Sequence, residues 1–189
     1  MNKKLIIGVL VFGLFLGCKD QEQVELPEPT DSNAVYDLPH IELVQQSDVA
    51  ENATSQWSVF DEFTSILVSI PGSNIERIRT QSDRLTRYSD SLMKHIPDNL
   101  ITMPIQNRLD VIHARMNLLQ QSSEHIVVDS QKLKENYRES VLAFNALLHQ
   151  INEKFARDAI QQLEEGNFST EIQQRFRDSV FEIEKRKQK

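Results

Sequence analysis

The sequence predicts an all-α fold: an up-down domain resembling a four-helix bundle, with one extra C-terminal helix, placed after an N-terminal signal and a disordered tether. Apolar residues recur every three or four positions over most of residues 45–189, which is the period of an amphipathic helix. That range contains only two glycines, Gly72 and Gly166, too few for a turn-rich β architecture. No proline or glycine lies between Ile105 and Glu165, so nothing there interrupts a helix.

The first 17 residues have the organisation of a signal peptide. Two lysines precede an uninterrupted run of 12 apolar or glycine residues, Leu5 to Leu16, and the small residue Gly17 follows. A permanent transmembrane helix needs about 20 apolar residues, so this run is too short to span a bilayer. We therefore expect residues 1–17 to be a cleaved signal.

Cys18 is the only cysteine in the chain. It ends the string Phe15-Leu16-Gly17-Cys18, which resembles the lipobox of bacterial lipoproteins, where the cysteine is acylated and becomes the new N-terminus. An unpaired thiol is unusual in an exported protein, and acylation accounts for it. The resemblance implies a lipid anchor on Cys18, and two or more acyl chains hold a protein stably on a membrane. The alternative is a chance cysteine behind an ordinary secretory signal.

The segment directly after Cys18, Lys19-Asp20-Gln21-Glu22-Gln23, is similar to the charged segment at this position in surface-exported lipoproteins of Bacteroidota. This resemblance implies a cell-envelope protein anchored in the outer membrane, on its surface or on its periplasmic face. We expect the acidic, proline-containing residues 18–44 to be a disordered tether. Residues 63–189 hold 17 acids and 18 bases, and such a nearly neutral body lacks the basic field that nucleic acid requires.

Three amphipathic helices are expected in the first part of the domain. The first covers residues 47–70 and ends at Pro71-Gly72, the second follows an N-cap at Ser73 and covers 75–96, and the third starts at Pro104. The predicted core positions are Val49, Ala53, Trp57, Phe60, Phe63, Leu67 and Ile70 in the first; Ile75, Ile78, Ser82, Leu85, Ser89, Leu92 and Ile96 in the second; and Ile105, Leu109, Ile112, Met116, Leu119, Ser123 and Ile126 in the third.

The fourth helix, capped by Asp129 or Ser130, is expected to reach Glu165 and to extend past its neighbours because it is longer than they are. Its predicted core positions are Leu133, Tyr137, Val141, Phe144, Leu148, Ile151 and Phe155. Gly166 is the expected C-cap, and Ser169 the expected N-cap of a fifth helix around residues 172–183.

The end of the fourth helix and the fifth helix form a hairpin that the bundle does not obviously cover. Exposed apolar area of this kind usually marks a binding surface. We therefore expect this end of the molecule to bind an envelope protein or a second copy of the chain. The expected contact residues are Phe155, Phe168, Phe176 and Phe181.

The sequence offers little that indicates catalysis or a cofactor. No Gly-x-Ser-x-Gly string occurs, and no His-Glu-x-x-His, Glu-x-x-His or Cys-x-x-Cys-His string is present, so neither an enzyme nor a bound cofactor is expected. His113 and His149, on the flanks of the third and fourth helices, are the remaining candidates for a metal pair. The expected function is that of a small helical envelope lipoprotein similar to those of Bacteroidota, acting through protein contacts. The alternative is a bundle that binds a metal or a small ligand.

Overall fold

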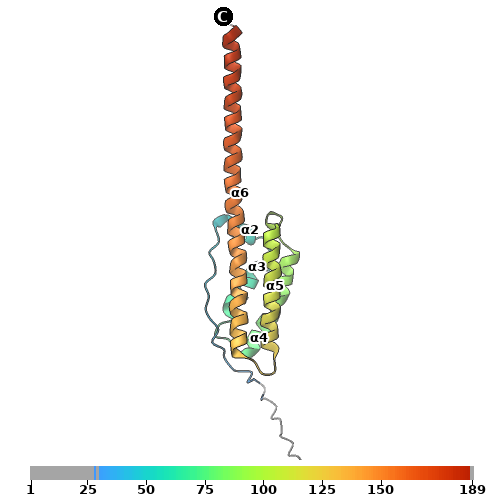
Figure 1. The fold of residues 1–189 in the computed structure, drawn as a ribbon. Helices are drawn as coiled ribbons and strands as arrows, with labels where there is room; N and C mark the ends of the chain where they lie inside the picture. The colour runs from blue at the N-terminus through green and yellow to red at the C-terminus, as the bar shows by residue number, and fades with distance from the viewer. Residues whose placement is uncertain (1–27, 29, 188–189) are drawn as a thin grey trace, which may run out of the picture.

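The protein is seen here as a computed structural model that describes residue 28 and residues 30–187, without the side chains of residues 167, 168, 176 and 179–187. Within these residues the fold is all-α, as the sequence predicts, and the β structure is limited to one isolated bridge between Val35 and Asn74. The elements are α2 (Asp48–Thr54), α3 (Phe60–Ser69), α4 (Ile75–Lys94), the 3-10 helix η2 (Asp98–Leu100), α5 (Met103–Glu124) and α6 (Ser130–Lys187) (Figure 1). The predicted signal peptide and Cys18 lie outside the described residues.

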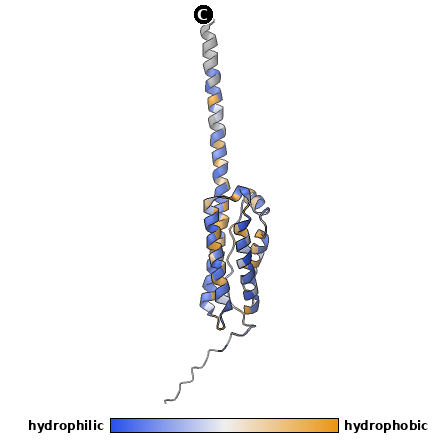
Figure 2. Ribbon diagram, turned by 90° about the vertical axis from the view of Figure 1, so that its right-hand side faces the viewer, coloured by the Kyte–Doolittle hydropathy of each residue, from blue (hydrophilic) through white to orange (hydrophobic). Residues whose placement is uncertain are grey.

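The body of the molecule is built from α4, α5 and the first half of α6, which run alongside one another in alternating directions, with α3 packed on α4 and α2 packed on α6 (Figure 1). Buried apolar residues from all of these helices form one core, and Figure 2 shows the apolar residues of the helices in orange. Most core positions expected from the three-four spacing are buried. The serines predicted in the seam of α4 and α5 are buried as well, and Ser82 and Ser123 share a hydrogen bond of 3.1 Å.

Aromatic rings fill the core between α3 and α6. Phe144 lies 5.6 Å from Phe60 and 5.2 Å from Phe63, measured between ring centroids. Two buried polar aromatic groups donate hydrogen bonds to backbone carbonyls: the indole of Trp57 donates to Leu92 O at 3.1 Å, and the hydroxyl of Tyr137 donates to Leu67 O at 3.1 Å. Burial raises the pKa of Tyr137 to about 12, because the protein interior disfavours the phenolate.

The first predicted helix is two helices, α2 and α3, and this part of the prediction is wrong. The chain leaves the helical conformation after Thr54, and Val59, the N-cap of α3, has a left-handed backbone with φ of 60°. A β-branched residue avoids this conformation, so the tertiary structure imposes it. The break allows Trp57 to turn into the core, and it leaves Val49, predicted to be buried, on the surface.

Most of the described helix ends fall at or near the capping residues that the sequence predicts. Asp129 accepts from the amides of residues 131 and 132 at the start of α6, and Pro104 lies in the first turn of α5. The N-cap of α4 is Asn74 and not the expected Ser73. Ile126, predicted to occupy the seam of α5, lies beyond its C-terminal end and is 74% exposed.

Residues 30–47 form an extended segment, here called the strap, that runs along the outside of α6 (Figure 1). We expected residues 18–44 to be a disordered tether, but from Thr30 onward the chain is packed on the body. Tyr36 and Leu38, two residues apart, both bury their side chains in the core, as alternating residues of an extended chain do. Residues 18–27 and 29 lie outside the described part.

The expected hairpin of a fourth and a fifth helix is instead one continuous helix, α6, of 58 residues. Gly166 does not end the helix. The α-helix continues through this residue, and the hydroxyl of Thr170 donates a hydrogen bond to the carbonyl of Gly166 at 2.9 Å. Residues 156–187, here called the projecting segment, extend beyond the body by about 48 Å at 1.5 Å per residue (Figure 1).

Substitution of two leucines on α6 tests which face of this helix contributes to the stability of the fold. Leu147 is fully buried, whereas Leu142 is 41% exposed. Leu147→Ala should lower the free energy of unfolding by about 2–5 kcal/mol, because it leaves a cavity in a close-packed core. Leu142→Ala should cost less than about 1 kcal/mol. Urea unfolding followed by Trp57 fluorescence measures both, and equal losses would contradict the packing of α6.

Continuity of α6 at Gly166 can be tested by substitution with alanine. A Cβ added at Gly166 meets no atom within 4 Å, and alanine is better than glycine by about 1 kcal/mol inside a helix. Gly166→Ala should therefore slow amide hydrogen exchange around this residue roughly fivefold. The matched control is Gly72→Ala, also in open space but at φ of +76°, which should destabilise the protein. Faster exchange in Gly166→Ala would indicate a helix end at this position.

Candidate functional site

Nearly every described side chain of the projecting segment is exposed. It carries Ile160 and Leu163, which are 57% and 69% exposed, three positions apart on one side of the helix. Ile172 is also exposed farther along. Apolar residues therefore continue along α6 after the body has ended, among polar and charged neighbours (Figure 2).

Of the four phenylalanines expected to contact a partner, only Phe155 has a described side chain. It is half-buried at the edge of the core, and the ammonium of Lys154 lies 4.4 Å from the centre of its ring. Lys154 also pairs with Asp158 at 2.7 Å. The side chains of Phe168, Phe176 and Phe181 lie outside the described residues, although their backbone belongs to α6.

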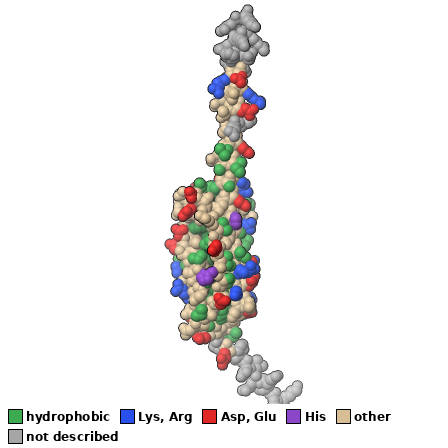
Figure 3. Space-filling model, turned by 90° about the vertical axis from the view of Figure 1, so that its left-hand side faces the viewer, with side chains coloured by type: hydrophobic (Ala, Val, Ile, Leu, Met, Phe, Trp, Pro, Cys, Tyr) green, Lys and Arg blue, Asp and Glu red, His purple; other side chains and the backbone are tan. Residues whose placement is uncertain are grey.

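A groove of about 540 Å³ lies where the projecting segment leaves the body. It is lined by the apolar Val49 of α2 and Phe155 and Ala156 of α6, together with the polar Gln45, Gln46, Ser47 and Asn152. Hydrophobic side chains gather in this region of the surface (Figure 3). The groove and the exposed side of the projecting segment together make an apolar surface at this end of the body.

The two histidines considered as a metal pair have different surroundings. His113 is half-buried on α5, and its Nδ1 lies 2.9 Å from the hydroxyl oxygen of Ser89 on α4. His149 is exposed on α6. Among the residues that the structure describes, no group of three or more histidine, cysteine, aspartate or glutamate side chains could hold a metal ion.

Two asparagines of α6 hold the strap against the body, and the sequence reasoning missed both. Asn145 donates to the carbonyl of Glu42 and accepts from the amide of Val44, each at 2.9 Å. Asn152 repeats the pattern with the carbonyl of Gln45 at 2.9 Å and the amide of Ser47 at 3.0 Å. Each side-chain amide thus offers one donor and one acceptor, as a neighbouring β-strand would. Their spacing of seven residues, which places both on one face of a helix, was the available signal.

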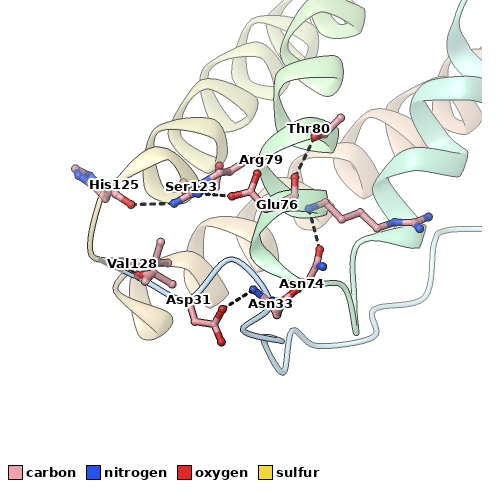
Figure 4. Close-up of polar contacts among 11 residues, drawn as sticks. Asp31, Asn33, Asn74, Glu76, Arg79, Thr80, Ser123, His125 and Val128 are labelled. Carbon is pink, nitrogen blue, oxygen red and sulfur yellow. Dashed lines mark hydrogen bonds and ion pairs between the residues drawn. The ribbon is translucent and has the colours of Figure 1, made fainter. Parts of the chain in front are cut away.

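At the other end of the body, Arg79 of α4 caps the C-terminus of α5. Its Nε donates to the carbonyl of Ser123 at 2.8 Å, and its Nη2 donates to the carbonyl of His125 at 3.2 Å, while Nη1 pairs with Glu76 at 2.7 Å (Figure 4). A cation at this position also suits the negative end of the helix dipole. Arg79 therefore fixes the start of the loop between α5 and α6.

Most of the remaining ion pairs among the described residues lie along single helices. A hydrogen bond from Lys94 holds the pKa of Asp90 below its usual value, and a hydrogen bond from Arg138 does the same for Glu135. These carboxylates are about half exposed at the surface, so their pairs adjust the surface charge and contribute little to stability. Two described pairs join different segments: Arg115 of α5 with Glu139 of α6 at 3.5 Å, and Lys134 of α6 with Asp37 of the strap at 3.8 Å.

Comparison with known proteins gives no relative: no family model matches the chain, and neither the curated proteins nor the solved structures contain a match. None of the described helices is both long and apolar enough to cross a membrane. The functional argument therefore depends on the geometry of this molecule alone.

The asparagine contacts should control how firmly the strap is held. Asn152→Ala removes two hydrogen bonds to the strap backbone, each with a net value of about 0.5–1.5 kcal/mol. We expect limited proteolysis within residues 40–47 to become several-fold faster, with little change in global unfolding. Asn107→Ala, at an exposed position on α5, is the matched control and should leave cleavage of the strap unchanged. Equal cleavage rates in both variants would show that the strap is held by other contacts.

Proposed function

We propose that this chain is a lipid-anchored helical lipoprotein of the cell envelope, in the outer membrane, that acts without catalysis by presenting the projecting segment of α6 to a partner protein. The body is interpreted as an up-down helical bundle whose role is to hold α6 in a fixed direction. The expected anchor is the acylated Cys18, on the strength of its resemblance to a lipobox.

The observation that carries the proposal is the placement of the two ends of the described chain. Thr30, where the continuous described chain starts, donates its amide to the carbonyl of Ile126 in the loop between α5 and α6. The projecting segment leaves the body at the opposite end (Figure 1). A membrane attached through Cys18, 12 residues before Thr30, would therefore lie at the loop end, with the projecting segment directed away from it.

The partner surface is expected to be the apolar side of the projecting segment. Ile160 and Leu163 are the largest aliphatic residues on its first turns beyond the body, and both are mostly exposed. Helices that dock in this way use apolar anchors at positions i, i+3 and i+4. The groove beside Phe155 lies at the base of the same surface, so a partner helix could contact the projecting segment and the body together.

Binding of a small ligand is the alternative, and one observation favours it. A notch of about 290 Å³ between the end of α4 and the start of α5 is lined by the apolar Met93, Ile96, Met103 and Leu109. A ligand bound there would raise the melting temperature with its concentration, because binding to the folded state adds RT ln(1 + [L]/Kd) to stability. A partner that binds α6 would leave the notch free.

The double substitution Ile160→Gln with Leu163→Gln tests the proposed surface. Glutamine has a helix propensity close to that of leucine, so α6 should persist while its apolar side is removed. Chemical crosslinking in intact cells should give a defined adduct with the wild-type protein and lose it with the double variant. Both proteins should stay in the membrane fraction, since Cys18 is unchanged.

Two controls separate the anchor from the contact surface. Val68→Gln changes an exposed valine on the body and should keep the adduct. Cys18→Ala should release the protein from the membrane. An adduct that survives the double substitution would contradict the assignment of the surface, and membrane retention of Cys18→Ala would contradict the lipid anchor.

A further inference from the structure

The loop between α5 and α6 exposes two adjacent aliphatic side chains at the tip of the body. Ile126 is 74% exposed and Val127 is 45% exposed. The heptad pattern of α5 assigns Ile126 to the core, yet α5 ends at Glu124 and the loop directs this residue into solvent. The next residue, Val128, is buried again, so the exposed pair forms a small apolar tip on this loop.

This tip is held in place from two sides. Arg79 donates to the carbonyls of Ser123 and His125, immediately before the tip (Figure 4). Thr30 of the strap forms two hydrogen bonds with the tip. Its amide donates to the carbonyl of Ile126 at 2.8 Å, and its hydroxyl accepts from the amide of Val128 at 2.8 Å. The two aliphatic side chains are therefore presented on a fixed backbone.

The same contacts connect the tip to the expected lipid anchor, so this inference rests on the proposed acylation of Cys18. Thr30 follows Cys18 by 12 residues. A flexible chain of that length spans about 19 Å on average and about 40 Å when fully extended. Thr30 is hydrogen-bonded to the tip. Of the two ends of the body, the tip end is therefore the one nearer to the anchor along the chain.

The charges around the tip indicate what kind of surface it can approach. Glu28, Asp31, Glu124 and Asp129 lie next to the tip or at the start of the strap, against Arg79 and the neighbouring Lys132. The net charge here is negative, and negatively charged lipids would repel it. A neutral or zwitterionic surface imposes no such repulsion and accepts aliphatic side chains.

We propose that Ile126 and Val127 insert into the interface of a zwitterionic lipid bilayer, as a second contact beside the lipid anchor. Two aliphatic residues give only weak binding by themselves. The anchor makes this contact intramolecular, at an effective concentration set by the short tether, so weak insertion is sufficient. With one contact at Cys18 and another at the tip, the body is oriented on the membrane and α6 points outward.

The test uses the full acylated protein in phosphatidylcholine vesicles, with an environment-sensitive dye on a cysteine introduced by His125→Cys. His125 is exposed and adjacent to the pair, so both aliphatic residues stay in place. We expect blue-shifted emission and several-fold stronger quenching by nitroxide-labelled lipid than for the matched reporter Asn99→Cys. Asn99 is exposed in η2 at the opposite end of the body. Adding Ile126→Asn and Val127→Asn to the first reporter should abolish its quenching.

The outcomes separate this inference from the proposed function. Suppose that the protein carries the acyl chains and floats with the vesicles, but the dye at residue 125 is as solvent-exposed as the dye at residue 99. That result overturns this inference alone. A protein without acyl chains on Cys18 overturns both. Stronger quenching with phosphatidylglycerol than with phosphatidylcholine would overturn the assignment to a zwitterionic surface. Unchanged quenching after the double asparagine substitution would show that the aliphatic pair does not insert.

Discussion

The unbroken backbone of α6 is the constraint on which the rest of the structure depends. Its first half supplies the wall against which α5, the aromatic core and the strap pack, with Leu133, Phe144 and Ile151 fully buried. Its second half is the projecting segment. Because both halves belong to one helix, the direction of the projecting segment follows from the packing of the body, and no hinge among the described residues separates the two.

The strap links this helix to the other end of the molecule. Asn145 and Asn152 hold its later part to α6, and Thr30 holds its start to the loop between α5 and α6. An extended segment lacks the regular internal hydrogen bonds of a helix, so many of its backbone groups need partners from elsewhere when it lies on a surface. The two asparagine side chains supply partners for four of them, in residues 42–47. The strap thereby runs the length of the body and leaves it opposite to the projecting segment (Figure 1).

Comparison of individual residues shows where pattern reasoning succeeds in this protein. The seams of α4, α5 and α6 were predictable because each buried position recurs at the helical period, including the serines at 82, 89 and 123. Val49 and Ile126 follow the same period and are exposed: the chain breaks between α2, which contains Val49, and α3, and α5 ends before Ile126. The three-four spacing of apolar residues predicts which residues face the core only within one unbroken helix.

The candidate surfaces were predictable only in part. The excess length of α6 over its neighbours indicated an uncovered end, and the structure describes Ile160 and Leu163 there as exposed. The histidines on the surface (Figure 3) do not form a described metal cluster, which spacing alone could not decide. The asparagine contacts and the apolar tip were missed, since both arise between segments about 100 residues apart in the chain.

The sequence by itself determined the helical class, the seams between the main helices and the unequal lengths of those helices, because these depend on periodicity and on the scarcity of glycine and proline. The tertiary structure alone decided that α6 passes through Gly166, that the first predicted helix breaks at Val59, and that the strap is packed. For the break at Val59 and the packed strap, the physical reason is that contacts with distant residues outweigh a local preference, which a local pattern does not contain. At Gly166, where an added Cβ would meet no atom within 4 Å, the cost of glycine in a helix, about 1 kcal/mol, is too small to end α6.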